Sequence, residues 1–251
     1  MIELRGVTAA RGPGLRPAVR DIDLRIPRRG HTAIVGLSGS GKTTLFSLIL
    51  RFLQPQEGSL LLNGQAYEES APWELRAKIA YVEQETPLVP GTIGENLRFS
   101  HPEATDEELR RVLREVGLDG KVDSLEDGLD SPLSPATVSG GERQRIALAR
   151  AILRTPDVLL LDEATAQIDA LSEAAVHTVI RDRDRDRDRA RHGAVVTIAH
   201  RLSTVLDADA IIVMEAGRIR ATGTHETLLA TDDLYRRLIS ALRINATQPA
   251  A

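Results

Sequence analysis

The stretch that most constrains this 251-residue chain is GLSGSGKT, at residues 36–43. Gly36 and Gly41 are separated by four residues and followed directly by Lys42 and Thr43, which is the spacing of a phosphate-binding loop. Glycines in such a loop allow backbone conformations in which successive N–H groups face inward. Those groups and the positive end of the following helix form a cradle for phosphate oxygens. The sequence therefore predicts a phosphate site.

The residues on both sides of the loop fit this prediction. Residues 31–35 are typical of a buried strand, and residues 44–50 are typical of the helix into which a phosphate loop leads. In this setting Lys42 can reach the β- and γ-phosphates of a nucleotide, and the Thr43 hydroxyl can bind Mg²⁺. The alternative is a glycine-rich turn that matches by chance, and the flanking strand and helix argue against it.

Composition excludes several other classes of protein. A net charge of −4 argues against a nucleic-acid surface, and the absence of cysteine excludes disulfides. The longest apolar runs, such as residues 158–161, are far too short to span a bilayer. The first residues lack the basic-then-apolar pattern of a signal peptide. We therefore expect a soluble cytosolic protein, in which any membrane span comes from another segment or chain.

The remaining pattern predicts an α/β core interrupted by a helical region. Between residues 87 and 153 strand patterns give way to helical ones: residues 105–108 form a capping box, and a helix is expected from about residue 140 to residue 153. We expect a tight turn at residues 63–64, a terminal helix over 228–242 and a frayed tail after 244. The predicted strands cover residues 2–7, 19–26, 58–62, 79–82, 157–162, 194–199 and 211–214, with residues 217–221 pairing back on the last of them.

A second nucleotide element follows this helical region. The apolar run at residues 157–162 is typical of a central parallel strand, and it ends in Asp162 and Glu163. A carboxylate at such a strand end can orient Mg²⁺, often through water, and a second one can sit beside the γ-phosphate as a general base. An apolar run that ends in two acids is weak evidence alone, but downstream of a phosphate loop it favours a nucleotide site.

Ser139, Gly140, Gly141 and Glu142 begin a helix in the helical region. A hydroxyl and two small residues at a helix N-terminus make a second anion site. One bound nucleotide needs only one such cradle, so this pattern indicates that the second cradle binds the γ-phosphate held by another chain. The alternative is an ordinary helix cap.

With these motifs in one order, the whole chain resembles the nucleotide-binding domain of an ATP-binding cassette (ABC) transporter. The matching segments are residues 36–43 (Walker A), Gln84 (Q-loop), 138–142 (signature), 158–163 (Walker B), 166–169 (D-loop) and His200 (switch). Residues 91–97, GTIGENL, and 198–204, IAHRLST, resemble the exporter branch.

The resemblance implies a fold and a division of the chain. The fold is a P-loop NTPase (RecA-like) α/β core with a mostly parallel sheet, an N-terminal antiparallel β subdomain and an inserted α-helical subdomain. The core is expected over residues 1–86 and 156–244, the helical subdomain over 87–155 and a disordered tail over 245–251.

The resemblance also implies ATP and Mg²⁺ as ligands and an ATP-hydrolysing motor domain of an exporter. Two domains, identical or diverged, are expected to enclose two nucleotides head to tail, with Asp169 at their seam. Residues 85–90 are expected to receive coupling helices of a transmembrane domain at the cytoplasmic face of the membrane, with no role for nucleic acid. The expected catalytic residues are Glu163, His200, Gln84 and Lys42, and the expected Mg²⁺ ligands are Thr43, Gln84 and Asp162. The expected ATP contacts are Arg11, Val19, Gly36, Leu37, Ser38, Gly39, Ser40, Gly41, Lys42, Thr43 and Thr44. The residues expected to contact the ATP of a partner domain are Ser139, Gly140, Gly141 and Glu142.

Several positions depart from the family pattern. The family usually stacks adenine on an aromatic residue of the first loop, but no Phe, Tyr or Trp precedes Phe46 in this chain. Arg11 falls near the expected position, where a guanidinium can stack on a base, and Val19 could add an apolar wall. We therefore expect weak discrimination between bases. Glu142 replaces the glutamine that the family usually has at this position, and residues 131–136 lack the glutamate that usually precedes the signature. The alternating Arg-Asp run at residues 181–189 is either a solvated extension or an interaction surface.

Two other functions stay open from the sequence. One is a separate ATPase subunit of an importer, against which residues 91–97 argue. The other is a regulatory module that binds ATP with little turnover, against which Glu163 and His200 argue. A chromosome-maintenance ATPase is a poor fit, because no sustained heptads occur.

Overall fold

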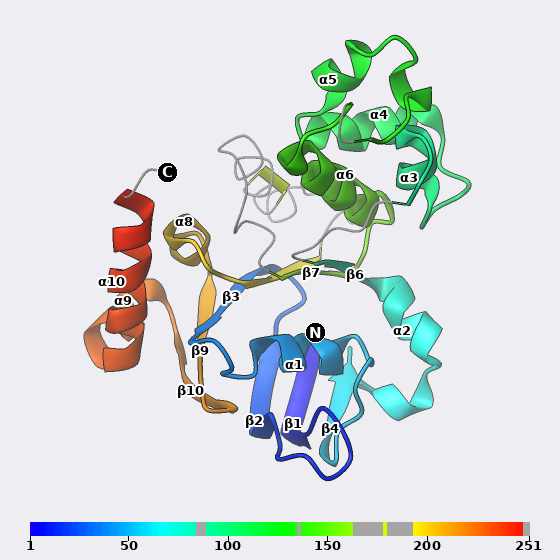
Figure 1. Ribbon diagram of the computed structural model, residues 1–251. Coiled ribbons are helices and arrows are strands. Elements are labelled where there is room, and N and C mark those ends of the chain that lie inside the picture. The colour runs from blue at the N-terminus through cyan, green and yellow to red at the C-terminus, as the bar shows by residue number, and fades with distance from the viewer. Residues whose placement is uncertain (84–88, 135–136, 163–177, 180–192, 248–251) are drawn as a thin grey trace.

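The computed structural model describes residues 1–83, 89–134, 137–162, 178–179 and 193–247. Within them the chain forms an antiparallel sheet in the order β2-β1-β4-β5 and a second sheet in the order β10-β9-β3-β8-β7-β6 (Figure 1). The strands are β1 (Ile2–Ala9), β2 (Val19–Ile26), β3 (Gly30–Gly36), β4 (Glu57–Leu62), β5 (Gln65–Ala66), β6 (Ile79–Val82), β7 (Val158–Asp162), β8 (Ala194–Ile198), β9 (Ala210–Glu215) and β10 (Arg218–Gly223).

The second sheet is the mostly parallel sheet that the sequence predicts. Strands β6, β7, β8, β3 and β9 run parallel to their neighbours, and only β10 turns back antiparallel on β9. Strands β7 and β8 are buried along their whole length, as expected of central strands with both faces covered. The P-loop NTPase fold class is confirmed.

The antiparallel sheet pairs β1 with both β2 and β4. Its β4–β5 connection is the tight turn predicted at residues 63–64, because Leu62 pairs with Gln65 across it. Asn63 and Gly64 have φ of 56° and 88°, the left-handed values that a two-residue hairpin turn of type I′ requires.

Helix α1 (Lys42–Ile49) lies between the two sheets and joins them into one core. Its Leu45 and Phe46 pack in the same buried cluster as Leu4 of β1 and Leu160 of β7. Side chains alternate along a strand, so Leu160 faces α1 while Leu159 and Leu161 face the opposite side of the sheet. The phosphate loop therefore leads into a helix that is held from both sides.

Over β6, β7 and β8, the opposite face of the parallel sheet is covered by the helical region, shown in green in Figure 1. The predicted capping box is confirmed, because the Thr105 hydroxyl accepts from the Glu108 N–H and the Glu108 carboxylate accepts from the Thr105 N–H. The helices here are α3 (Ile93–Arg98), α4 (Asp106–Glu115), α5 (Asp119–Asp123), η2 (Gly128–Asp130) and α6 (Gly140–Leu153).

The expectation of a single terminal helix over residues 228–242 is wrong. Two helices, α9 (His225–Thr231) and α10 (Asp233–Thr247), meet at Asp232, whose backbone is extended. The Asp232 carboxylate accepts the Tyr235 N–H at 2.7 Å and the Arg220 Nε–H at 2.7 Å, so it caps α10 and ties it to β10. The helix continues to Thr247, into the segment for which we expected a disordered tail.

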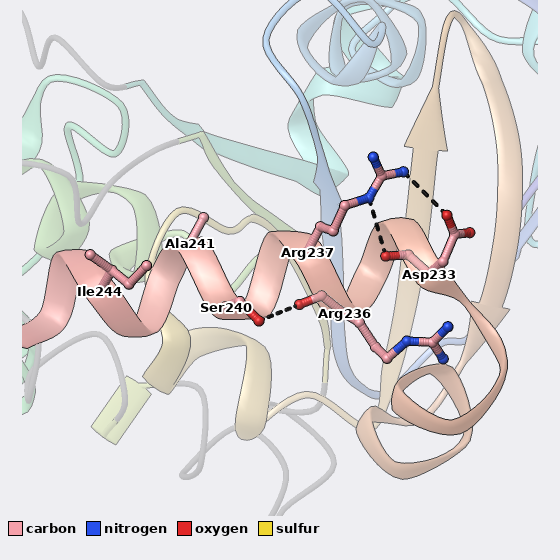
Figure 2. Close-up of a pocket in the computed structure, with 6 residues that line it drawn as sticks. All are labelled: Asp233, Arg236, Arg237, Ser240, Ala241 and Ile244. Carbon is pink, nitrogen blue, oxygen red and sulfur yellow. Dashed lines mark hydrogen bonds and ion pairs between the residues drawn. The ribbon is translucent and has the colours of Figure 1, made fainter.

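One side of α10 is exposed. Figure 2 shows this side, where the Arg237 guanidinium binds the Asp233 carboxylate and the Ser240 hydroxyl donates to the Arg236 carbonyl. The opposite side packs Leu234, Tyr235 and Ile239 against the sheet cluster that contains Ala33 of β3.

Three short helices were not predicted: η1 (Tyr67–Glu69), α2 (Pro72–Lys78) and α8 (Leu202–Leu206). Across the described ranges, none of the helices is long and apolar enough to cross a membrane.

Candidate functional site: a phosphate loop at the edge of the parallel sheet

The loop between β3 and α1 has a backbone that only glycine accommodates. Gly41 caps α1 with φ of 104°, and Gly39 has φ of 76°. A Cβ on Gly36 would lie 2.3 Å from the Met214 carbonyl oxygen, and one on Gly41 would lie 2.9 Å from the Ala18 carbonyl oxygen. The loop is therefore packed against β9 and the start of β2 as closely as a bare backbone allows.

Two side chains of the loop fit a phosphate. Lys42 is buried and its Nζ donates to the carbonyls of Gly36 and Leu37, at 2.8 and 3.0 Å, so its ammonium group is folded back over the loop. The buried Ser40 hydroxyl has no hydrogen-bond partner among the described residues. A phosphate oxygen would give the Ser40 hydroxyl a partner, since buried polar atoms are rarely left unpaired, and it would attract the Lys42 ammonium. Thr43, the expected Mg²⁺ ligand, is exposed at the start of α1.

Two predicted ATP contacts lie beside the loop in different settings. Arg11 is exposed, and its Nε donates to the Thr44 hydroxyl at 3.0 Å. The side chain of Val19 is fully buried, and its Cγ1 would lie 2.9 Å from a Cβ placed on Gly41. Val19 therefore packs against the loop backbone at Gly41, and the apolar wall that it could offer to a base stays a prediction.

Asp162 ends β7 in a buried position, and its Oδ2 accepts a hydrogen bond from the Tyr81 hydroxyl at 3.2 Å. Tyr81 lies on the neighbouring strand β6, and its ring meets Phe46 of α1 edge-to-face. Burial, and secondarily the Asp162 charge, raise the pKa of Tyr81, so the hydroxyl stays protonated and donates. Sequence reasoning missed Tyr81, because no local motif marks a contact between strands.

Replacing Tyr81 with phenylalanine is expected to raise the Mg²⁺ concentration needed for half-maximal ATP hydrolysis by about tenfold, the usual effect of removing a hydrogen bond to a metal-binding carboxylate. ATP binding measured in EDTA should not change. Tyr67→Phe is the matched control: the Tyr67 hydroxyl donates to the Ile49 carbonyl at 3.1 Å within the same core, so its loss lowers stability alone. An equal shift of the Mg²⁺ requirement in both variants would contradict the role of Tyr81.

The strand register brings the ends of β3, β8, β7 and β6 to one edge of the sheet. Ile198 of β8 pairs with both Ile34 of β3 and Asp162 of β7, and Leu161 pairs with Val82 of β6. His200 follows β8 by two residues and is half-buried. Carboxyl ends of parallel strands are where ligands of open α/β sheets bind. The predicted Gln84, Glu163 and Asp169 lie outside the described residues, as do residues 181–189.

The start of α6 has the structure of a capped helix. The Ser139 hydroxyl accepts from the Glu142 N–H at 3.2 Å, and the Glu142 Oε2 accepts from the Ser139 N–H at 2.7 Å. The other Glu142 oxygen lies 3.9 Å from the Lys121 ammonium. The glutamate that replaces the usual glutamine therefore completes a capping box.

Residues 19–166 match the ABC transporter family. The chain belongs to this family. It is 40% identical over 222 residues to a "Putative export ATP-binding/permease protein" of Rickettsia bellii, a match that spans 88% of this chain and 37% of that protein. It is also 40% identical over 228 residues to "Iron-sulfur clusters transporter ATM1, mitochondrial" of Candida glabrata, with 90% of this chain and 31% of that protein covered.

The same relationship appears among solved structures. The whole chain superimposes on 42% of the chain in "Structure of a bacterial Atm1-family ABC exporter with ATP bound", with a TM-score of 0.86 and 31% sequence identity. This ABC domain thus spans about a third of the length of the two named relatives and well under half of the structural neighbour.

The structure adds one further element to the ABC phosphate loop, the turn between β9 and β10. The Gly217 N–H donates to the Ser40 carbonyl at 3.1 Å, and the Gly217 carbonyl accepts from the Arg20 N–H at 2.8 Å. Gly217 has φ of 80°, and a Cβ on it would lie 2.6 Å from the Ala18 carbonyl oxygen. This turn positions the loop from the far end of the chain, and no sequence motif pointed to it.

Proposed function

We propose that this chain is the ATP-binding and ATP-hydrolysing motor domain of an ABC exporter. The observation that carries the proposal is the phosphate loop. It holds the buried Lys42 ammonium and a buried Ser40 hydroxyl without a hydrogen-bond partner in the described part of the chain, and it follows β3 at the sheet edge where Asp162 ends β7. The exporter assignment is supported by the Rickettsia bellii relative, which is named an export ATP-binding/permease protein, and by the structural neighbour, which is an ABC exporter.

Each residue of the site has a proposed role in ATP binding or hydrolysis. Lys42 and the loop N–H groups bind the β- and γ-phosphates, while Thr43 and Asp162, with Gln84, hold Mg²⁺, which would neutralise phosphate charge. Glu163 accepts a proton from the attacking water. His200 donates a hydrogen bond to the γ-phosphate. Tyr81 keeps the Asp162 carboxylate oriented.

The site is completed by a second ABC domain. Ser139 and its neighbours begin α6 in the helical region, which packs on the sheet face opposite α1. We propose that this helix start closes over the nucleotide of a partner, identical or diverged, with Asp169 at the seam. Hydrolysis then reopens the pair. Residues 85–90 receive the coupling helices of a transmembrane domain at the cytoplasmic face of the membrane.

Glu163→Gln tests the proposal. The wild type should release phosphate from Mg-ATP, and the variant should do so at least 100-fold more slowly, which is within the range for loss of a general base. The variant should also trap ATP and elute as a dimer in size-exclusion chromatography. Glu126→Gln, at an exposed loop position, is the matched control and should behave as the wild type.

Equal low rates in the wild type and Glu163→Gln would instead support a regulatory module that binds ATP with little turnover. An importer subunit would share the ATPase result. It is distinguished by the native reading frame, which for an exporter of this kind encodes membrane helices on the same polypeptide.

A further inference from the structure

Arg11 places a second cation at the entrance of the phosphate loop. It lies in the exposed connection between β1 and β2, and its Nε donates to the Thr44 hydroxyl at 3.0 Å. Thr44 is buried in the first turn of α1, directly after Thr43. One bond therefore fixes the guanidinium beside the helix start, where N–H groups without a helical partner and the helix dipole favour an anion.

The two terminal nitrogens of the Arg11 guanidinium are open to a ligand. Within the part of the chain that the structure describes, no carboxylate pairs with Arg11, and the bond to Thr44 is its one hydrogen bond. Its two terminal nitrogens keep their four N–H donors, in the planar fork that binds phosphate oxygens in pairs. The side chain is thus anchored at one end and open at the other.

The connection that carries Arg11, residues 10–18, contains no Phe, Tyr or Trp that could stack on a base. The first Phe, Tyr or Trp of the chain is Phe46, which is buried edge-to-face against Tyr81. Val19 is buried beneath the loop. Leu15 is exposed in the same connection as Arg11, but a branched aliphatic side chain does not select among planar bases.

We propose that Arg11 binds the phosphate chain of the nucleotide, and that the site takes nucleoside triphosphates as a class rather than ATP alone. Arg11 keeps its Nε bond to Thr44 and directs its terminal nitrogens to phosphate oxygens, so that recognition rests on charge that every nucleoside triphosphate carries. This inference rests on the proposed function, because it concerns the same site.

Competition against a fluorescent ATP analogue on the wild-type chain tests the inference. ATP, GTP and CTP should bind with dissociation constants within about threefold of one another, because none of them gains a base contact. Arg11→Ala should weaken all three by about tenfold, and inorganic tripolyphosphate by the same factor, as expected for loss of charged hydrogen bonds. Arg11→Lys, which keeps the charge but not the fork, should fall between.

Arg11→Tyr supplies the opposite change. The tyrosine ring should provide a stacking surface, so the variant should bind ATP about tenfold more tightly than CTP, since aromatic–base stacking contributes ~1–3 kcal/mol. Thermal unfolding checks that the variants fold, which is expected because Arg11 is exposed.

Two results would overturn the inference: a tenfold or greater wild-type preference for ATP over CTP, or an Arg11→Ala effect on ATP that is absent for tripolyphosphate. Its failure can be told from failure of the proposed function. If the chain binds ATP selectively and hydrolyses it normally, only the inference about Arg11 is contradicted. If it binds all nucleotides equally but hydrolyses none of them, only the proposed ATPase function is contradicted. Absence of any nucleotide binding removes both.

Discussion

Replacement of Lys42 by alanine is expected to lower the affinity for ATP at least 100-fold and to abolish hydrolysis. The Lys42 ammonium is the one charged group that the loop itself supplies, and it is already folded over the Gly36 and Leu37 carbonyls. On binding it would exchange these partners for phosphate oxygens. Each charged hydrogen bond contributes ~1.5–3 kcal/mol, so the loss of two accounts for the expected factor. Titration with a fluorescent ATP analogue measures the affinity.

Lys78→Ala is the matched control for this change. Lys78 is exposed at the end of α2, so its loss removes the same charge from the chain without touching the site. The two variants should unfold at similar temperatures. Comparable ATP affinity in Lys42→Ala and Lys78→Ala would show that the loop does not bind the triphosphate.

Substitution of Ser139 by arginine is expected to separate binding from turnover. The variant should bind ATP with wild-type affinity as an isolated chain, because Ser139 starts α6 and the phosphate loop is built from other elements. Its hydrolysis should fall at least 100-fold, since the large side chain blocks approach of the helix start to a partner's γ-phosphate, a loss that costs several kcal/mol of transition-state stabilisation. Loss of the cap should lower stability by only about 1 kcal/mol.

Mixing the Ser139→Arg and Lys42→Ala chains gives the sharpest test of the head-to-tail pair. In a mixed dimer, one site combines the intact loop of the first chain with the intact helix start of the second, while the other site has both defects. Phosphate release should therefore reappear in the mixture although each variant alone is inactive. If the mixture stays inactive while the chains are shown to dimerise, either the sites do not combine residues from two chains or a single complete site cannot turn over.

Much of this architecture could be predicted because its signals are local. The loop at 36–43, the buried strand ending at Asp162, the capping box at Thr105 and the helix start at Ser139 each lie within a few residues, and backbone geometry over such spans is governed by glycine and by side-chain caps. The terminal helix was mispredicted because its apolar periodicity continues across Asp232. Asp232 instead has an extended backbone, and its carboxylate accepts from the Tyr235 N–H of α10 and from Arg220, on another element.

The sequence by itself determined the chemistry: which residues can bind phosphate, hold a metal or accept a proton, and the order in which they occur. Tertiary structure alone decided what surrounds them. Tyr81 meets Asp162 across 81 positions of sequence, Gly217 supports Ser40 from the β9–β10 turn, and the buried Val19 packs against Gly41 of the loop. These contacts depend on which strands become neighbours in the sheet, and strand order is set by burial of the whole core rather than by the residues within any one segment.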